Sequence, residues 1–191
     1  MIKLIYLIIF FTTLNIYAGG SVKGKILIDN EGLNNVVVYL EPDTKINFNP
    51  PKEPALIDQI NLSFVPHVLP VMKGTKVLFP NSDKIRHSVF STGDVKNFDL
   101  GTYPPGAEKS IICDTPGIIP VLCYIHHDMS AYIVVLETPY FSTSDDDGNF
   151  LIENIPAGKY KLSFWHEDTE IESENVEISE NKSLIKNIII D

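Results

Sequence analysis

A cysteine, a histidine and a methionine lie within seven residues of one another in the second half of the chain. Cys123, His126 and Met129 have the spacing C-x-x-H-x-x-M, and apolar runs at residues 118–124 and 131–136 flank them. Runs of this length, rich in β-branched and aromatic residues, predict two strands joined by a tight loop. The loop therefore brings together a thiolate, an imidazole and a thioether, and these soft donors suit copper.

A trigonal copper site with two histidines and one cysteine needs a second histidine. His87 is the candidate, because it follows an apolar strand that ends at residues 79–81 and a polar turn. It then opens the next short apolar run. A lone histidine at the start of a strand is usually structural, so this assignment depends on the sequence around it.

Four features in this order resemble the cupredoxins, the blue-copper family of plastocyanin, azurin and amicyanin. They are the G-T-x-V-x-F-x-N strand at residues 74–81, the histidine beyond it, the D-x-P-G turn at 114–117 and the C-x-x-H-x-x-M loop. The resemblance covers roughly residues 55–137, and the short loop is most similar to that of amicyanin. It implies a Greek-key β-sandwich that binds one copper ion per chain. The implied ligands are His87, Cys123, His126 and Met129, the last as a long axial ligand.

The sequence contains three other histidines, which we considered as alternative metal ligands. His127 adjoins His126 and would compete with it if the loop shifted by one residue, although the resemblance favours His126. His67 is expected to be structural, and His166 has no metal-binding neighbours in the sequence. Zinc fits this donor set less well, because structural zinc sites use four cysteines or histidines and seldom a methionine.

The sequence departs from the cupredoxin pattern at Ser88, where the family usually has an asparagine that joins the two ligand loops by hydrogen bonds. A hydroxyl forms fewer hydrogen bonds than an amide, so we expect a different reduction potential. Val89, Tyr124 and Ile125 are expected to form a dry apolar shell around the metal.

The two cysteines, Cys113 and Cys123, raise the alternative of a disulfide. If residues 114–117 are the turn of a hairpin, the two sulfurs lie about five positions apart along a strand, or roughly 17 Å. A bridge requires the Cα atoms to lie within about 7 Å. We therefore interpret Cys113 as a small buried hydrophobic residue and Cys123 as a free metal ligand.

Residues 1–18 contain one lysine and an apolar run at residues 4–11, and they end in Asn-Ile-Tyr-Ala before two glycines. The run is shorter than the roughly 20 residues that span a bilayer, so it predicts a secretory signal peptide. A retained membrane anchor is the alternative. The mature protein is expected to be periplasmic or secreted and not to span a membrane.

The rest of the chain is predicted to be mostly β, because it has no long stretch of helical periodicity. The D-G-N-F-x-I-x-N-I-P-A-G-K-Y-K-L segment at 147–162 resembles a transthyretin-like, carboxypeptidase regulatory-like β-sandwich. Residues 21–41 resemble the opening strands of that module. Three consecutive valines at 36–38 predict that its second strand is covered on both faces or lies at the centre of a sheet.

The predicted fold class is therefore all-β, with a cupredoxin sandwich inserted in, or packed beside, a second small β-sandwich. Two domains side by side, or one enlarged barrel, are the alternatives. The predicted division is a signal peptide (1–18), the first strands of the transthyretin-like sandwich (19–46), the cupredoxin domain (47–137) and the remainder of the transthyretin-like sandwich (138–191).

The resemblance implies an electron carrier that cycles between Cu(II) and Cu(I). The sequence contains no Ser-His-Asp set or phosphate-binding loop, so we expect no enzyme and no small-molecule substrate. A formal net charge of -10 argues against nucleic acid and is compatible with a basic redox partner protein. A copper-binding or delivery protein and a non-redox interaction module are the alternatives.

Overall fold

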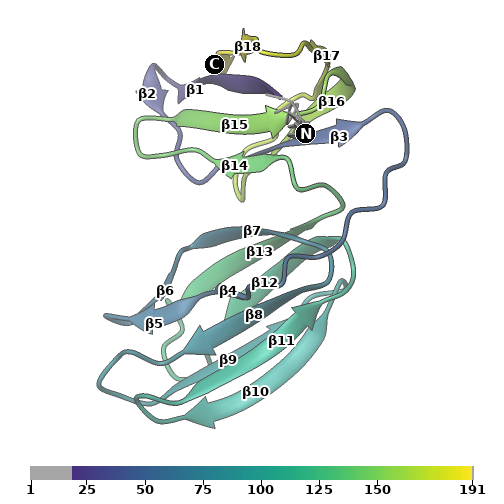
Figure 1. Cartoon of the computed structure of the whole chain (residues 1–191). Helices are drawn as coiled ribbons and strands as arrows, with labels where there is room; N and C mark the ends of the chain where they lie inside the picture. Colours follow the sequence, from purple (N-terminus) through teal and green to yellow (C-terminus); the bar gives the residue numbers. More distant parts are fainter. Residues whose placement is uncertain (1–18, 191) are drawn as a thin grey trace, which may run out of the picture.

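The computed structural model describes residues 19–190, and all its regular elements in that range are strands (Figure 1). The predicted all-β fold class is confirmed. The predicted signal peptide lies outside the described residues. No helix among residues 19–190 is long and apolar enough to cross a membrane.

Ten strands from the middle of the chain form the lower body in Figure 1, which we call the middle sandwich. One sheet has the order β10-β9-β12-β13-β7, the other has the order β11-β8-β4, and a β5–β6 hairpin lies beside them. Val77 and Phe79 from one sheet pack with Ile119 and Ile133 from the other. The strands are β4 (Ala55–Leu56), β5 (Asp58–Ile60), β6 (Ser63–Val65), β7 (Val68–Met72), β8 (Thr75–Pro80), β9 (His87–Thr92), β10 (Asn97–Tyr103), β11 (Glu108–Cys113), β12 (Gly117–Leu122) and β13 (Ser130–Leu136).

The remaining strands form the upper body, which we call the flanking sandwich (Figure 1). Strand β1 pairs with β15 and β18, and β3 pairs with β14 and β16. Strands from both ends of the chain therefore share its sheets, while the domain bounds given above stay a prediction. The strands are β1 (Gly20–Ile28), β2 (Glu31–Gly32), β3 (Val37–Pro42), β14 (Phe141–Thr143), β15 (Asn149–Ile155), β16 (Gly158–Trp165), β17 (Glu174–Ile178), β18 (Ser183–Ile185) and β19 (Ile188–Ile190).

The first residues of strand β3 are buried on both faces, as the run of valines predicts, whereas Glu41 near its end is exposed. Val38 and Leu40 point into the core of the flanking sandwich, where they pack with Leu162. Val37 lies in a separate apolar cluster with Val134 from the middle sandwich. The side chains of a strand alternate between faces. One face of β3 therefore packs in the core of the flanking sandwich, and the other packs against the middle sandwich.

Residues 114–117 do not form the turn of a hairpin, which was the condition assumed in the argument against a disulfide. Strand β11 pairs with β8, whereas β12 pairs with β13 and β9, so the turn carries the chain from one sheet to the other. Gly117 has φ +129°, and a Cβ atom there would lie 2.6 Å from a methyl group of Val95. Cys113 and Cys123 are nevertheless both free, as predicted.

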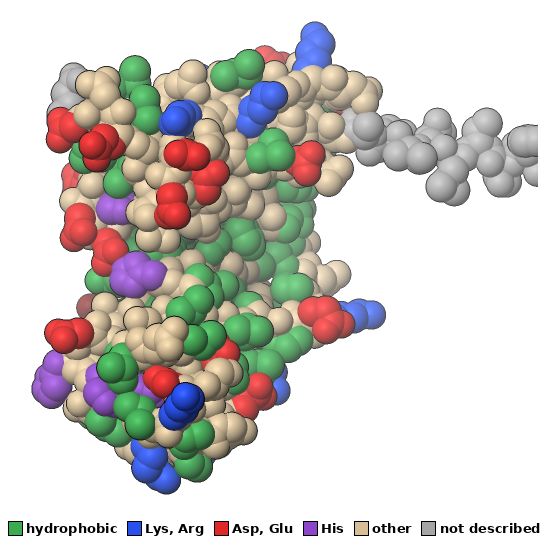
Figure 2. All heavy atoms as spheres, turned by 90° about the vertical axis from the view of Figure 1, so that its left-hand side faces the viewer, with side chains coloured by type: hydrophobic (Ala, Val, Ile, Leu, Met, Phe, Trp, Pro, Cys, Tyr) green, Lys and Arg blue, Asp and Glu red, His purple; other side chains and the backbone are tan. Residues whose placement is uncertain are grey.

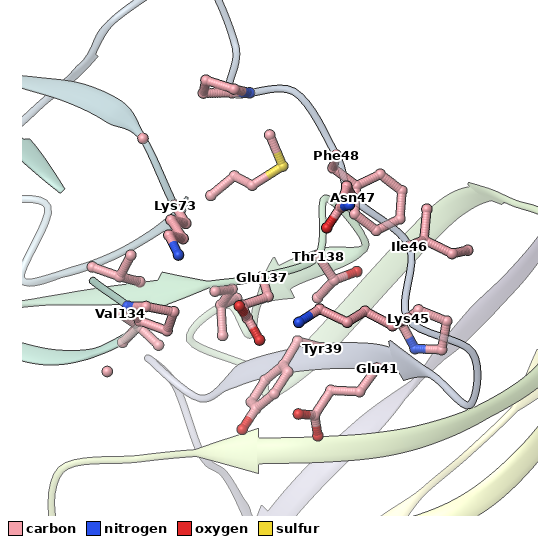
Figure 3. A pocket seen from close by; sticks show the side chains of 18 of the residues that line it. Tyr39, Glu41, Lys45, Ile46, Asn47, Phe48, Lys73, Val134, Glu137 and Thr138 are labelled. Carbon is pink, nitrogen blue, oxygen red and sulfur yellow. The ribbon is translucent and has the colours of Figure 1, made fainter. Parts of the chain in front are cut away.

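An open cleft lies between the two sandwiches, beside the loop that follows β3 (Figure 3). Charged side chains of both signs line it, including Glu41, Lys45, Lys73 and Glu137. None of the residues that line it is a predicted metal ligand, so the cleft is separate from the site described below.

The Leu40→Ala variant is expected to destabilise the protein by about 2–5 kcal/mol, because it leaves a cavity in a fully buried core position. Denaturant unfolding followed by circular dichroism measures the change. The matched control is Leu151→Ala, since Leu151 belongs to the same sandwich and is 47% exposed. Equal unfolding midpoints for the two variants would contradict the placement of β3 in this core.

Candidate metal centre

His87, Cys123 and His126 form a cluster in which one possible ligand atom from each residue lies within 4.8 Å of the others. His87 is the first residue of β9, and Cys123 directly follows β12. These two strands pair antiparallel, with Leu122 opposite Phe90. The pairing brings together side chains that are 36 positions apart in the sequence.

Met129 is the last residue of the loop between β12 and β13 and is 1% exposed. Its backbone N–H donates a hydrogen bond of 3.0 Å to the carbonyl of His126, which closes the loop as a tight turn before β13 begins. Its side chain belongs to the same buried cluster as Cys123. The local C-x-x-H-x-x-M spacing thus folds as the sequence predicts.

The two histidine rings face each other through the same type of nitrogen. Nδ1 of His87 and Nδ1 of His126 are 3.0 Å apart. Nε2 of His87 lies 3.0 Å from Oδ2 of Asp83, an oxygen that can only accept a hydrogen bond when ionised, so Nε2 carries the proton. Nδ1 of His87 then keeps its lone pair and accepts a hydrogen bond from the Nδ1–H group of His126. The same lone pair is available to a metal.

Ser88 joins the two segments that carry the proposed ligands by hydrogen bonds, although a hydroxyl forms fewer hydrogen bonds than an amide. Its hydroxyl donates to Sγ of Cys123 at 3.6 Å and accepts a hydrogen bond of 2.8 Å from the backbone N–H of Tyr124. A single hydroxyl thereby joins the start of β9 to the loop after β12.

The pKa values of the two cysteines are shifted in opposite directions. Burial acts to raise the pKa of Cys123, but the N–H groups of Ser88, His126 and Ile125 and the Ser88 hydroxyl together lower it below the ordinary value of a thiol. Burial raises the pKa of Cys113 to about 12. Cys123 therefore loses its proton more readily than Cys113 and is the better candidate for a thiolate ligand.

Asn81, the last residue of the G-T-x-V-x-F-x-N strand, and Asp83, which the sequence pattern did not single out, hold the loop before His87. Asn81 is 1% exposed, and its side chain donates to the carbonyl of Ile85 at 2.9 Å and accepts from the N–H of Asp83 at 3.1 Å. The N–H groups of Leu62 and Lys84 lower the pKa of Asp83 below its ordinary value, and the contact with His87 adds to this effect. The i, i+4 spacing of Asp83 and His87 was the available signal in the sequence.

The expected apolar shell is only partly formed. Val89 is fully buried, but Tyr124 is 54% exposed and Ile125 is 44% exposed. Tyr124 instead stacks on Phe90 with ring centres 3.6 Å apart. Figure 2 shows histidine and hydrophobic side chains together on the surface at the lower end of the middle sandwich. The loop between two of the ligands is therefore open to solvent on one side, while the ligands themselves lie deeper.

The remaining histidines lie outside the cluster. His67 contacts the carbonyl of Ser130 through Nδ1 at 3.1 Å and Glu167 of the flanking sandwich through Nε2 at 2.6 Å. His127 is exposed. Nδ1 of His166 accepts a hydrogen bond from the backbone N–H of Asp168. His67 is thus a structural histidine, as expected, which joins the two sandwiches.

No protein-family model matches the chain, and a search of curated proteins finds no match. Solved structures match about half of it. A copper-containing nitrite reductase from Thermus scotoductus SA-01 is 25% identical with a TM-score of 0.44, and the match covers 51% of this chain and 26% of that one. This chain thus spans about a quarter of that enzyme.

Two smaller proteins match over nearly their whole length. A purple cupredoxin from Nitrosopumilus maritimus is 18% identical with a TM-score of 0.40, and the match covers 43% of this chain and 99% of that one. The reduced Cu(I) form of an amicyanin variant is 16% identical with a TM-score of 0.42, and the match covers 52% of this chain and 98% of that one. At these scores the matches do not establish a family, so the interpretation of the site depends on its own side chains. The transthyretin-like resemblance of the flanking segments stays a prediction.

In the metal-free protein, Cys123 is expected to titrate at a lower pH than an unperturbed thiol, because the effect of burial, which raises its pKa, is outweighed by the hydrogen bonds that lower it. The ultraviolet absorbance of the thiolate measures this in a Cys113→Ala background, which leaves a single thiol. A lowered pKa means that the folded state gains stability above the unfolded pKa and loses it as the pH falls through the folded one. Ser88→Ala should move the titration to higher pH, and a parent protein that titrates no lower than the same thiol in the unfolded chain would contradict the described hydrogen bonds.

Proposed function

We propose that this protein is an exported electron carrier that binds one copper ion in a type 1 site. The observation that carries the proposal is the cluster of one thiol and two imidazoles, with ligand atoms within 4.8 Å of one another and with His87 and Cys123 buried. Two histidines and a cysteine in a trigonal arrangement with a weak axial methionine are typical of electron-transfer copper sites. The proposed ligands are His87, Cys123, His126 and Met129.

The donor atoms present fit this metal. The thiol is the one whose pKa is lowered, and the Nδ1 atoms of both imidazoles converge on one point. For Nδ1 of His126 to serve as a ligand, the proton of the neutral ring would move from Nδ1 to Nε2, so both Nδ1 lone pairs would be available to a metal. Bound copper would supply a one-electron couple between Cu(II) and Cu(I).

The chain's own contribution is to hold the ligands still. Asp83 holds His87, Ser88 holds the Cys123 loop, and a backbone hydrogen bond holds Met129 against His126. Ligands that are fixed in this way change little in geometry between the two oxidation states, and this limits the reorganisation that each electron transfer requires.

The proposed partners are redox proteins, and the proposed location is the periplasm or the exterior of the cell. The exposed side chains of Tyr124 and Ile125, next to the proposed ligand Cys123, support an encounter at this end of the middle sandwich. The apolar run in residues 1–18 supports export.

We also propose that the middle sandwich is inserted into the flanking one. The pairing of β1 with β15 and of β3 with β16 supports this division, because residues from both ends of the chain complete the same sheets. The run from β4 to β13 pairs within itself.

Loading the protein with one equivalent of Cu(II) is expected to produce an intense visible thiolate-to-copper band that disappears reversibly with reductant. Cys123→Ser should abolish this band and leave a folded β protein, because serine cannot supply the thiolate. Cys113→Ala is the control and should keep the band, since Cys113 is not part of the cluster. A persistent band in the Cys123 variant would refute the site. Tight Cu(I) binding without any coloured Cu(II) form would instead indicate copper delivery.

Met129→Leu is expected to keep the visible band and to raise the reduction potential. The band comes from the thiolate, while loss of the thioether removes a donor that stabilises the more highly charged Cu(II). Leucine preserves the volume at a position that is 1% exposed, so the core should remain packed. Cyclic voltammetry measures the potential, and a value equal to that of the parent protein would exclude Met129 as a ligand.

A further inference from the structure

Asp83 is held by hydrogen bonds on every side. Its Oδ2 accepts from Nε2 of His87 at 3.0 Å and from the backbone N–H of Leu62 at 2.9 Å. Its Oδ1 accepts from the backbone N–H of Lys84 at 2.9 Å, and its own N–H donates to Asn81. A carboxylate with this many fixed donors has one orientation available to it.

This orientation determines which nitrogen of His87 faces the metal site. A neutral imidazole carries one proton, and the contact with Asp83 places it on Nε2. The side chain of His87 has no solvent exposure, so no water competes for that proton. Without Asp83, the proton could move to Nδ1 and block the position that a metal ligand must occupy.

The same carboxylate oxygen reaches the turn of the β5–β6 hairpin. Asn61 and Leu62 form this two-residue turn with φ +52° and +62°, a conformation that is strained for leucine. The side chain of Leu62 is 50% exposed, so its packing does not explain why a leucine adopts this conformation. The hydrogen bond from its N–H to Asp83 does give the turn a stabilising contact.

A second carboxylate joins the hairpin to the same loop. Asp58, the first residue of β5, accepts hydrogen bonds from the hydroxyl of Ser82 at 2.7 Å and from its N–H at 3.1 Å. The loop before His87 is therefore attached to the hairpin at two adjacent residues, Ser82 and Asp83.

We propose that Asp83 is a positioning residue that fixes the Nε2–H tautomer and the orientation of His87, and that it links this ligand to the β5–β6 turn through Leu62. The inference deepens the proposed function and rests on it, because His87 is one of the proposed copper ligands. The hairpin is then a structural part of the site, although it contributes no ligand.

Nuclear magnetic resonance of the metal-free protein in mildly alkaline buffer tests the contact without copper. In the parent protein, the imidazole nitrogen shifts of His87 should report the Nε2–H tautomer, and the amide of Leu62 should exchange slowly with solvent. Asp83→Ala should produce a mixture of tautomers and faster exchange at Leu62. Asp83→Asn keeps a neutral acceptor and should be intermediate. Parent-like signals at both positions in the alanine variant would overturn the proposal.

Two controls separate this role from general effects. Asp128→Asn removes the same charge from an exposed residue of the other ligand loop and should leave both signals unchanged. Leu62→Gly keeps the N–H and relieves the strain at positive φ, so His87 should stay in the same tautomer. A changed tautomer in Leu62→Gly would show that the leucine side chain, not its N–H, carries the link to the hairpin.

Copper binding then separates the two proposals. Asp83→Ala should bind Cu(II) about 10 to 100-fold more weakly in competition with a chelator, while Asp128→Asn binds like the parent. If the parent protein binds no copper, the proposed function fails, and the tautomer of His87 still decides the role of Asp83. If copper binds equally well to all variants, Asp83 does not position a ligand.

Discussion

The site depends on the antiparallel pairing of β9 with β12. That pairing sets Leu122 opposite Phe90 and leaves His87 and Cys123 at the same end of the sheet. A shift by one residue would turn every side chain of a strand to the opposite face, so the register decides whether the two ligands meet. Ser88 and the stacked rings of Phe90 and Tyr124 connect the same two segments. The sheet thus defines the site, and the loops complete it.

Local features of the site could be predicted from the sequence, and features that depend on distant contacts could not. The tight loop from Cys123 to Met129 follows from its spacing, and the double burial of residues 36–38 follows from three adjacent valines. The change of sheet at Gly117 did not follow, because a turn sequence does not specify whether its two strands pair with each other. The contact between Asp83 and Leu62 did not follow either, because the two residues are 21 positions apart and nothing in the sequence marks them as partners.

The contact between the two sandwiches places constraints on both. Val37 from β3 and Val134 from β13 share one apolar cluster, and His67 pairs with Glu167 at its edge. Tyr132 lies between these groups, with its ring near both His67 and Trp165. Because β13 directly follows the loop that holds Met129, the flanking sandwich packs against a strand that also positions the site. The two bodies are therefore coupled through β13.

The sequence separation of the paired strands also suggests which of the two sandwiches folds first. Lys23 of β1 pairs with Leu151 of β15, so this sheet must close a loop of well over a hundred residues. In an unfolded chain that closure costs about 4 kcal/mol in entropy. The strands between them pair among themselves, and their prior folding would shorten the flexible part of that loop. The middle sandwich is thus expected to fold first and to act as a template that brings the two ends of the chain together.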